Sequence, residues 1–210
     1  MPTTKTRLQG LYAITDPHLT PPSQLQDSVE QALQGGAGII QYRDKSDDHQ
    51  LRNQQAKDLL TLCNQYNALL IINDDISLCQ ATGAHGVHLG LEDENLETAR
   101  KMLGNNAIIG ATCHGSLLNA EKAIQQGADY VAFGRFYRSK TKPDAEPAAL
   151  GSIASRLSSL SVPAVAIGGI NLNNATALIN AGFSMLAVVD DVFSQSDIKT
   201  QCQHYQKLWH

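Results

Sequence analysis

The chain lacks the cysteine spacings that would indicate a zinc site or a disulfide framework. Its four cysteines, Cys63, Cys79, Cys113 and Cys202, form no CxxC pair. They are expected to be reduced thiols, as is usual in the cytoplasm. The first residues carry no apolar core of a signal peptide, and no apolar run approaches membrane-spanning length. We therefore expect a cytoplasmic protein with no membrane partner.

Basic residues are too few for a general nucleic-acid-binding protein. The chain has 16 Lys and Arg against 20 Asp and Glu, a formal net charge of −4. Its 210 residues are 42% hydrophobic, which suits a globular protein. We expect one catalytic domain over residues 1–210, with small molecules and no nucleic acid as partners. The sequence leaves the oligomeric state open, a homo-oligomer included.

Short apolar runs rich in β-branched residues recur at regular spacing. They are LYAIT, GIIQY, LLIIN, GVHLG, AIIGA, YVAFG, AVAIGGI and MLAVV. The runs are continuously hydrophobic, as parallel strands covered on both faces are. Between them lie segments with helical periodicity, at residues 23–33, 48–66, 116–126, 147–160 and 173–181.

Eight strand-then-helix units along the chain predict an α/β fold, a single (β/α)8 TIM barrel with parallel strands. Four glycine-led junctions, GGAGII, TGAHGV, QGADYV and NAGFSML, precede every second strand. A barrel built from doubled units would produce this, and so would the preference of helix ends for glycine. A doubly wound open sheet is the alternative, although no GxGxxG follows the first strand.

Polar residues follow the ends of the expected strands, where such barrels carry their chemistry. Gln41, Arg43 and Lys45 alternate after the second strand, so they would point to one side and suit a phosphate or carboxylate group. Asp74 follows the third strand and Asp93 the fourth. Two carboxylates beside cations favour Mg2+ together with the oxygens of a phosphorylated substrate.

The last three strands also end in residues suited to anions. Arg135, Arg138, Lys140 and Lys142 crowd into residues 135–142 of this acidic chain. VAIGGIN and LAVVDD match the loops that often hold a phosphate through backbone N–H groups in barrels. A tight turn that needs glycine would explain the first of these stretches equally well. Asp75, just before ISLCQ, is expected to cap the helix that follows.

Together these stretches resemble the thiamine-phosphate synthase family over nearly the whole chain. LYAITDP, GGAGIIQYRDK, IINDD, GVHLGLED, IIGATCH, GADYVAFGRFYRSKTKP, VAIGGIN and VVDDVF stand in the family's order and spacing. The resemblance implies a TIM barrel and a Mg2+-dependent transferase of thiamine biosynthesis. Its partners would be two phosphorylated small molecules, an aminopyrimidine methyl diphosphate and a thiazole phosphate, joined with loss of diphosphate.

The resemblance also implies which residues form the site. The pyrimidine diphosphate would be bound by Gln41, Tyr42, Arg43, Asp44, Lys45, Asn73, Thr112 and Lys142. The Mg2+ ligands would be Asp74 and Asp93. The thiazole phosphate would be bound by Ser139, Lys140, Thr141, Gly169, Val189 and Asp190. Lys142, Arg43 and Thr112 would be the catalytic residues.

The chain departs from the family's usual pattern at several positions. Leu91 stands where Gln is frequent, Thr112 where Ser is common, and Arg135 and Arg138 where prolines are frequent. Asp190 replaces a common Ser and brings a negative charge near a phosphate. The implied chemistry tolerates these changes, because it needs diphosphate stabilisation and alignment of two reactants rather than a strong base.

Three other interpretations stay open at this point. A thiazole tautomerase of the same barrel family would use His114 as its acid and base. Another phosphate-binding isomerase or epimerase would explain the paired glycines but not the two aspartates with Lys142. A non-catalytic ligand-binding relative would explain Leu91 and Asp190. For the synthase, His88 and His114 are expected to be structural or to shape the pocket through hydrogen bonds.

Overall fold

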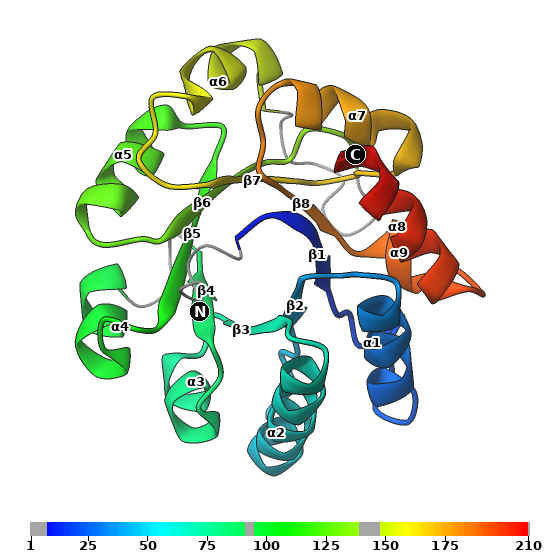
Figure 1. Ribbon diagram of the computed structural model, residues 1–210. Helices are drawn as coiled ribbons and strands as arrows, with labels where there is room; N and C mark the ends of the chain where they lie inside the picture. Colours follow the sequence, from blue (N-terminus) through cyan, green and yellow to red (C-terminus); the bar gives the residue numbers. More distant parts are fainter. Residues whose placement is uncertain (1–7, 91–94, 139–147, 210) are drawn as a thin grey trace.

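The computed structural model describes residues 8–90, 95–138 and 148–209. Within them, parallel strands close into a barrel in chain order, from β1 round to β8 beside β1 (Figure 1). The strands are β1 (Gly10–Ile14), β2 (Ile39–Tyr42), β3 (Leu69–Asn73), β4 (Gly86–Leu89), β5 (Ile108–His114), β6 (Tyr130–Gly134), β7 (Ala164–Ile167) and β8 (Met185–Val188). The predicted TIM barrel is confirmed.

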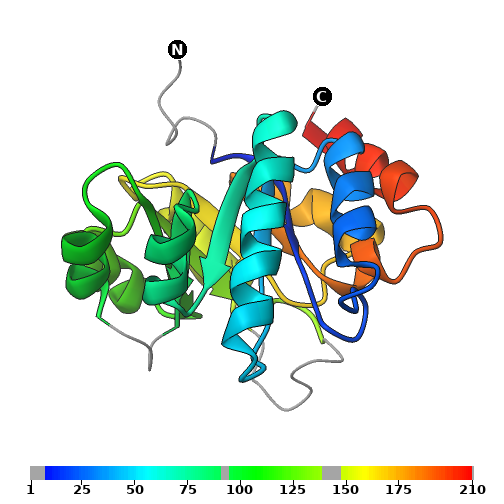
Figure 2. The same cartoon turned by 90° about the horizontal axis from the view of Figure 1, so that it is seen from below.

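Helices surround the barrel and run alongside the tilted strands (Figure 2). They are α1 (Leu25–Gln34), α2 (His49–Gln65), α3 (Ile76–Thr82), α4 (Leu96–Leu103), α5 (Leu117–Gln125), α6 (Leu150–Leu157), α7 (Leu172–Asn180), α8 (Asp190–Phe193) and α9 (Ile198–Gln206), followed by a 3-10 turn, η2 (Lys207–Trp209). None of the helices in the described ranges is long and apolar enough to span a bilayer.

The helical segments expected from periodicity are confirmed, with shifts at their ends. The pattern at residues 147–160 gives a shorter helix, α6, and part of that stretch lies outside the described residues. The structure adds α4, α8 and α9, which were not among the helices predicted from periodicity. Helix α3 begins where Asp75 was predicted to cap it, because the Asp75 side chain accepts a hydrogen bond from the Leu78 amide at 2.7 Å.

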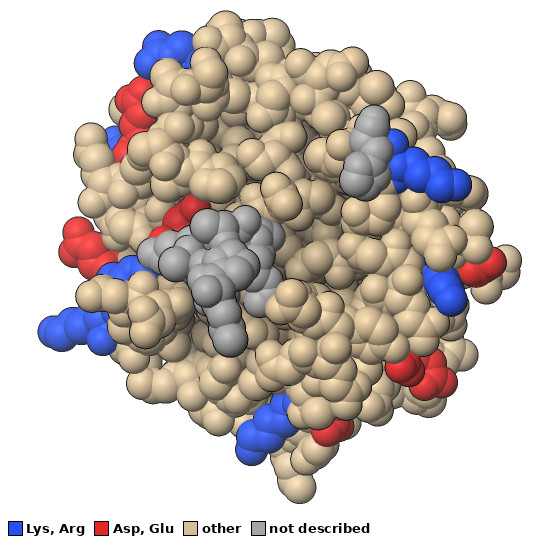
Figure 3. Space-filling view, viewed as in Figure 1, with Lys and Arg blue, Asp and Glu red and all other residues tan. Residues whose placement is uncertain are grey.

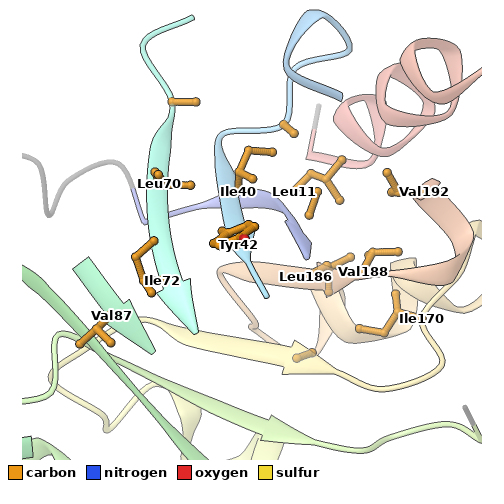
Figure 4. Packing of buried hydrophobic residues seen from close by; sticks show 14 of the residues in the cluster. Leu11, Ile40, Tyr42, Leu70, Ile72, Val87, Ile170, Leu186, Val188 and Val192 are labelled. Carbon is orange, nitrogen blue, oxygen red and sulfur yellow. The ribbon is translucent and has the colours of Figure 1, made fainter. Parts of the chain in front are cut away.

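Strand residues alternate between two apolar layers because successive side chains of a strand point to opposite faces. Leu11, Ile40 and Leu70 belong to the outer layer between strands and helices (Figure 4). Tyr12 and Ile39, one position away along their strands, belong to a second cluster inside the barrel. The parallel register pairs Tyr12 with Ile39 on neighbouring strands. The inner layer thus comes from residues at alternate strand positions, and it can carry polar groups where those positions are polar.

Arg100 of α4 fastens the end of the barrel at which the strands begin. Its guanidinium donates to the carbonyl oxygens of Ala107 at 2.7 Å and Gly127 at 2.9 Å, and to Asp129 Oδ2 at 2.6 Å. The same Asp129 oxygen accepts from the Ile109 amide at 2.9 Å. One side chain therefore ties α4 to the starts of β5 and β6.

On the face of the molecule seen in Figure 3, the visible charged side chains lie mainly near the outline.

Arg100→Ala is expected to lower the free energy of unfolding by about 2–3 kcal/mol, because it leaves the mostly buried Asp129 carboxylate without its cation. The catalytic constants should not change, because Arg100 lies where the strands begin, at the opposite end of the barrel from their carboxyl ends. Urea denaturation of this variant beside Lys101→Ala, which removes an exposed cation on the same helix, measures the effect. Equal midpoints for the two variants would contradict the assignment.

Candidate active site

A cleft of about 490 Å³ opens at the carboxyl ends of β2 and β3. It is lined by Asp44, Lys45, Arg52, Asn73, Asp74, Asp75, Ile76 and Ser77. The lining brings three carboxylates and two cations together. The cleft is thus suited to an anion that carries its own metal ion, because both signs of charge are present at close range.

Asp74 is the carboxylate of this cleft that pairs with the exposed Lys45. Its backbone has φ 63°, in the left-handed region, and its amide donates to the His88 carbonyl oxygen at 2.8 Å. Its Oδ2 accepts from Asn73 Nδ2 at 2.6 Å and lies 3.1 Å from Lys45 Nζ. The Lys45 side chain is 62% exposed and that of Asp74 is 28% exposed. The pair therefore faces the open cleft, and an oxygen ligand of this kind fits Mg2+.

The other two carboxylates of the cleft are engaged in holding the fold. Asp75 caps α3 and forms an ion pair with Arg52 at 2.8 Å. Asp44 Oδ1 accepts from the Ser46 amide at 2.7 Å, which tightens the turn after β2. Among the side-chain atoms described, Arg52 Nε is buried without a hydrogen-bond partner. These contacts leave Asp74 as the described carboxylate best placed to meet a bound cation.

The segment from Gln41 to Lys45 does not gather into one row of donors. Gln41 is 3% exposed and turns into the barrel, whereas Lys45 forms an ion pair with Asp74. Arg43 lines a second, much smaller hollow, and its amide donates to Thr15 Oγ1 at 2.9 Å. The Tyr42 side chain packs in the outer apolar layer. Its hydroxyl donates to Gln55 Oε1 of α2 at 2.7 Å.

A continuous chain of hydrogen bonds crosses the interior of the barrel below its mouth. Gln41 Nε2 donates to the Tyr12 hydroxyl at 2.7 Å, and the Tyr12 and Tyr130 hydroxyls lie 2.8 Å apart. The Tyr130 hydroxyl is 3.0 Å from His88 Nδ1, and His88 Nε2 is 2.9 Å from Thr112 Oγ1. Two residues that the family resemblance assigns to the pyrimidine, Gln41 and Thr112, therefore stand at the two ends of one chain.

Packing holds the middle of this chain in place. The His88 ring stacks on the Tyr130 ring with centroids 5.5 Å apart and an interplanar angle of 18°. Tyr130 is 0% exposed, and a Cβ at Gly110 would overlap its ring. Desolvation lowers the pKa of His88 to about 4, and the nearby Asp74 charge opposes the shift only in part. The lowered pKa favours neutral His88 at pH 7, and both of its ring nitrogens are engaged in hydrogen bonds inside the barrel.

The turn after β7 is built from two glycines pressed against the segment after β6. Gly168 has φ +103° and Gly169 has φ +64°. A Cβ at Gly169 would overlap the carbonyl oxygens of Tyr137 and Arg138. Asn174 of α7 donates to the Gly169 carbonyl oxygen at 3.0 Å. The backbone there is thus fixed by close contact on one side and a hydrogen bond on the other.

The remaining residues assigned by sequence fall into two groups. Val189 packs against the inner cluster, and Asp190 is exposed at the start of α8. Asp93, Ser139, Lys140, Thr141 and Lys142 lie outside the described residues. Among the described residues no group of three or more His, Cys, Asp or Glu could hold a metal ion. Asp74 is thus the part of the expected metal pair that the structure describes.

Sequence reasoning missed Tyr12, Tyr130 and Arg52 as parts of the site. The two tyrosines were interpreted only as apolar strand residues. A signal was present, because both hydroxyls fall at alternate, inward positions of strands whose neighbours point outward. His114, named for the tautomerase interpretation, is exposed with φ 49°.

Comparison with known proteins places the chain among close relatives. Residues 11–192 match the family model described as thiamine monophosphate synthase. The chain is 49% identical over 191 residues to a thiamine-phosphate synthase of Alcanivorax borkumensis, covering 91% of this chain and 88% of that one. It is 48% identical over 209 residues to one of Thioalkalivibrio sulfidiphilus, covering 100% and 99%. A thiamine phosphate pyrophosphorylase structure from Pyrococcus furiosus superposes with a TM-score of 0.88 at 34% identity, covering 97% and 96%.

Proposed function

The chain belongs to the thiamine monophosphate synthase family, and we propose that its barrel mouth joins an aminopyrimidine methyl diphosphate to a thiazole phosphate, releasing diphosphate. It is a thiamine-phosphate synthase, a transferase of thiamine biosynthesis. One observation carries the assignment of the site. The Asp74–Lys45 pair at the cleft lies beside the Gln41–Thr112 hydrogen-bond chain, because Asp74 bonds to the backbone of His88.

The diphosphate would lie in the cleft at the ends of β2 and β3. Lys45 and Arg52 supply positive charge there, and Lys45 can turn from Asp74 to a phosphate oxygen because its side chain is largely exposed. Asp74, with Asp93 from outside the described residues, would hold Mg2+. A bound Mg2+ would neutralise charge on the leaving diphosphate. Lys142 and Arg43 are proposed to add to this neutralisation.

The reaction needs charge stabilisation and alignment more than a base. Electron density from the amino group of the pyrimidine reaches the exocyclic methylene, so the C–O bond to diphosphate can break. The thiazole nitrogen then forms the new C–N bond to that carbon. Gln41 and Thr112 would hold the pyrimidine ring, and the backbone at Gly169, Val189 and Asp190 would hold the thiazole phosphate with Ser139, Lys140 and Thr141. Proximity and electrostatic stabilisation supply the rate.

Incubation of the pure protein with both phosphorylated substrates and Mg2+ tests the proposal. Thiamine phosphate and free diphosphate should appear in equal amounts, and excess EDTA should stop their formation. Isomerisation of a thiazole without diphosphate release would favour the tautomerase instead. Binding of both substrates without turnover would favour a non-catalytic relative.

Asp190→Ser is expected to lower KM for the thiazole phosphate while leaving kcat unchanged. The Asp190 side chain is exposed at the start of α8, so solvent screens its repulsion of a phosphate to at most about 1 kcal/mol, or about fivefold in KM. Asp197→Ser removes the same charge at the exposed cap of α9, where serine can still cap the helix. Steady-state kinetics of the two variants give the comparison. An unchanged KM for Asp190→Ser would mean that its carboxylate points away from the ligand.

We further propose that the protein acts in the cytoplasm. The four cysteines are buried and form no disulfide, which fits a reducing compartment. Sedimentation of the purified chain would decide its oligomeric state, a homo-oligomer included.

A further inference from the structure

The hydrogen-bond chain inside the barrel has only two self-consistent proton arrangements. Each tyrosine hydroxyl has one proton to donate, and a neutral imidazole donates from one nitrogen and accepts at the other. If one group in the chain reverses its role, every neighbour must reverse as well. The ends of the chain, Gln41 on β2 and Thr112 on β5, are therefore linked in what they can offer to a ligand.

The geometry at Gln41 selects one of the two arrangements. Its Nε2 donates to Tyr12. If the Tyr12 oxygen also accepted from Tyr130, the buried Tyr12 proton would have no acceptor among the described residues, so Tyr12 donates to Tyr130. The Tyr130 hydroxyl then donates to His88 Nδ1. This leaves the proton of the neutral imidazole on Nε2, which donates to Thr112 Oγ1. The Thr112 hydroxyl proton remains for the ligand, and within the described residues Gln41 Oε1 accepts no hydrogen bond.

We propose that Tyr12, Tyr130 and His88 are positioning residues, a relay that fixes Gln41 as an acceptor and Thr112 as a donor toward the ligand. The relay is closed to water over most of its length, because Gln41, Tyr12 and Tyr130 are 3%, 1% and 0% exposed. Water molecules that could reverse one bond independently of the others are therefore excluded. The neutral state of His88 is required, since an imidazolium would donate from both nitrogens and break the order.

The surroundings of His88 support its neutral state. Its ring is stacked on Tyr130, and its two ring nitrogens face the hydroxyls of Tyr130 and Thr112. A proton donated by Tyr130 to Nδ1 requires that nitrogen to carry none, so the ring in this arrangement is neutral. The Tyr12 and Tyr130 hydroxyls also stay protonated, because burial raises the pKa of both. All five groups thus keep one protonation state through neutral pH.

The fixed polarity distinguishes two classes of heterocycle, an inference that rests on the proposed function. An aminopyrimidine presents an N–H donor on its amino group beside an acceptor ring nitrogen. Its oxo analogue presents the reverse, a carbonyl acceptor beside a ring N–H donor. An acceptor at Gln41 and a donor at Thr112 match the amino form. With the oxo form, the acceptor of Gln41 would face an acceptor and the donor of Thr112 would face a donor. Such a mismatch lowers the binding affinity far more than a missing contact does.

Nitrogen-15 NMR of the histidine rings in the free protein tests the relay without any ligand. The resonances of His88 are assigned by their loss in His88→Gln. His88 should be the neutral Nε2–H tautomer from pH 6 to 8. His85 is an internal reference, because its Nδ1 accepts from the Leu70 amide at 3.0 Å and that donor cannot reverse. A doubly protonated His88, or the Nδ1–H tautomer, would overturn the proposal.

Tyr130→Phe tests whether the relay controls ligand choice. The wild-type protein should bind the aminopyrimidine diphosphate, with Mg2+ and without thiazole phosphate, at least about a hundredfold more tightly than the oxo analogue. Tyr130→Phe should lower this preference for the aminopyrimidine to about tenfold, because His88 Nδ1 then has no hydroxyl donor to fix its tautomer. The NMR signals of His88, but not of His85, should shift toward a mixture of tautomers.

Tyr205→Phe is the matched control, because Tyr205 is another buried tyrosine whose hydroxyl donates, to Asp191 at 2.7 Å. Tyr205→Phe should lower the free energy of unfolding but leave the ratio of affinities for the aminopyrimidine and oxo ligands unchanged. If the ratio of affinities fell equally in both variants, the effect would come from lost packing rather than from the order of hydrogen bonds, and the proposal would be overturned. An ordered His88 in a protein that makes no thiamine phosphate would uphold the relay and reject the proposed reaction, so the two failures are distinct.

Discussion

Replacement of Asp74 by asparagine is expected to lower kcat by at least about a hundredfold, the range for loss of one electrostatic stabiliser. The carboxylate is 28% exposed, lies 3.1 Å from Lys45 Nζ and faces the cleft at the ends of β2 and β3. A metal ion in the cleft would therefore compete with Lys45 for this carboxylate. Single-turnover kinetics with saturating substrates and increasing Mg2+ measure the loss. The Mg2+ concentration needed for half-maximal rate should also rise.

Asparagine is a better probe here than alanine because of the backbone. Asp74 has φ 63°, and alanine in the left-handed region would add about 1 kcal/mol of strain, whereas asparagine tolerates it. Asp74→Gly removes the side chain without strain and should lose activity as well. Asp58→Asn, on α2 outside the cleft, controls for charge. Near-normal turnover of Asp74→Asn with unchanged Mg2+ dependence would exclude the metal role.

Gly169→Ala is expected to lower the free energy of unfolding by about 2–5 kcal/mol, the sum of left-handed strain and overpacking. The new Cβ would overlap the carbonyl oxygens of Tyr137 and Arg138. Those are backbone atoms, so a side chain cannot simply turn aside. The segment after β6 must move, and KM for the thiazole phosphate should rise at least about tenfold if Gly169 approaches the phosphate, by loss of a hydrogen bond to charge.

Gly83→Ala separates the two causes. Gly83 at the end of α3 has φ +72°, and a Cβ added there would meet nothing within 4 Å. Only the strain of about 1 kcal/mol should appear there, with no change in KM. Guanidinium denaturation and steady-state kinetics of both variants give the comparison. Equal losses of stability would show that crowding at Gly169 is relieved without cost.

The barrel was predictable because its signals are local. Each continuous apolar run became a strand, and the cap at Asp75 could be assigned from the residues directly after β3. The direction of each polar side chain was less accessible. Gln41 and Tyr42 are adjacent on β2, so one turns into the barrel and the other packs against α2. The strand ends at Tyr42, so the alternation that predicted one row of donors does not extend to Arg43 and Lys45.

The relay was inaccessible to sequence reasoning for a related reason. The hydrogen bond between Tyr12 and Tyr130 joins residues 118 positions apart. A tyrosine in an apolar run is consistent with simple burial, and only closure of the barrel brings the two hydroxyls together. The left-handed backbone of Asp74 was equally hidden, because aspartate occurs in many other conformations. The family resemblance supplied Gln41 and Thr112 but not the residues that connect them.

The overlap that a Cβ at Gly110 would make with the Tyr130 ring ties the histories of two positions together. During evolutionary drift, a larger residue at Gly110 could be accepted only after the ring at Tyr130 had become smaller. That first step would also remove the hydroxyl that donates to His88. A larger residue at position 110 and the Tyr130 hydroxyl therefore exclude each other, and libraries that vary the two positions jointly should recover full ligand selectivity only at the glycine–tyrosine combination.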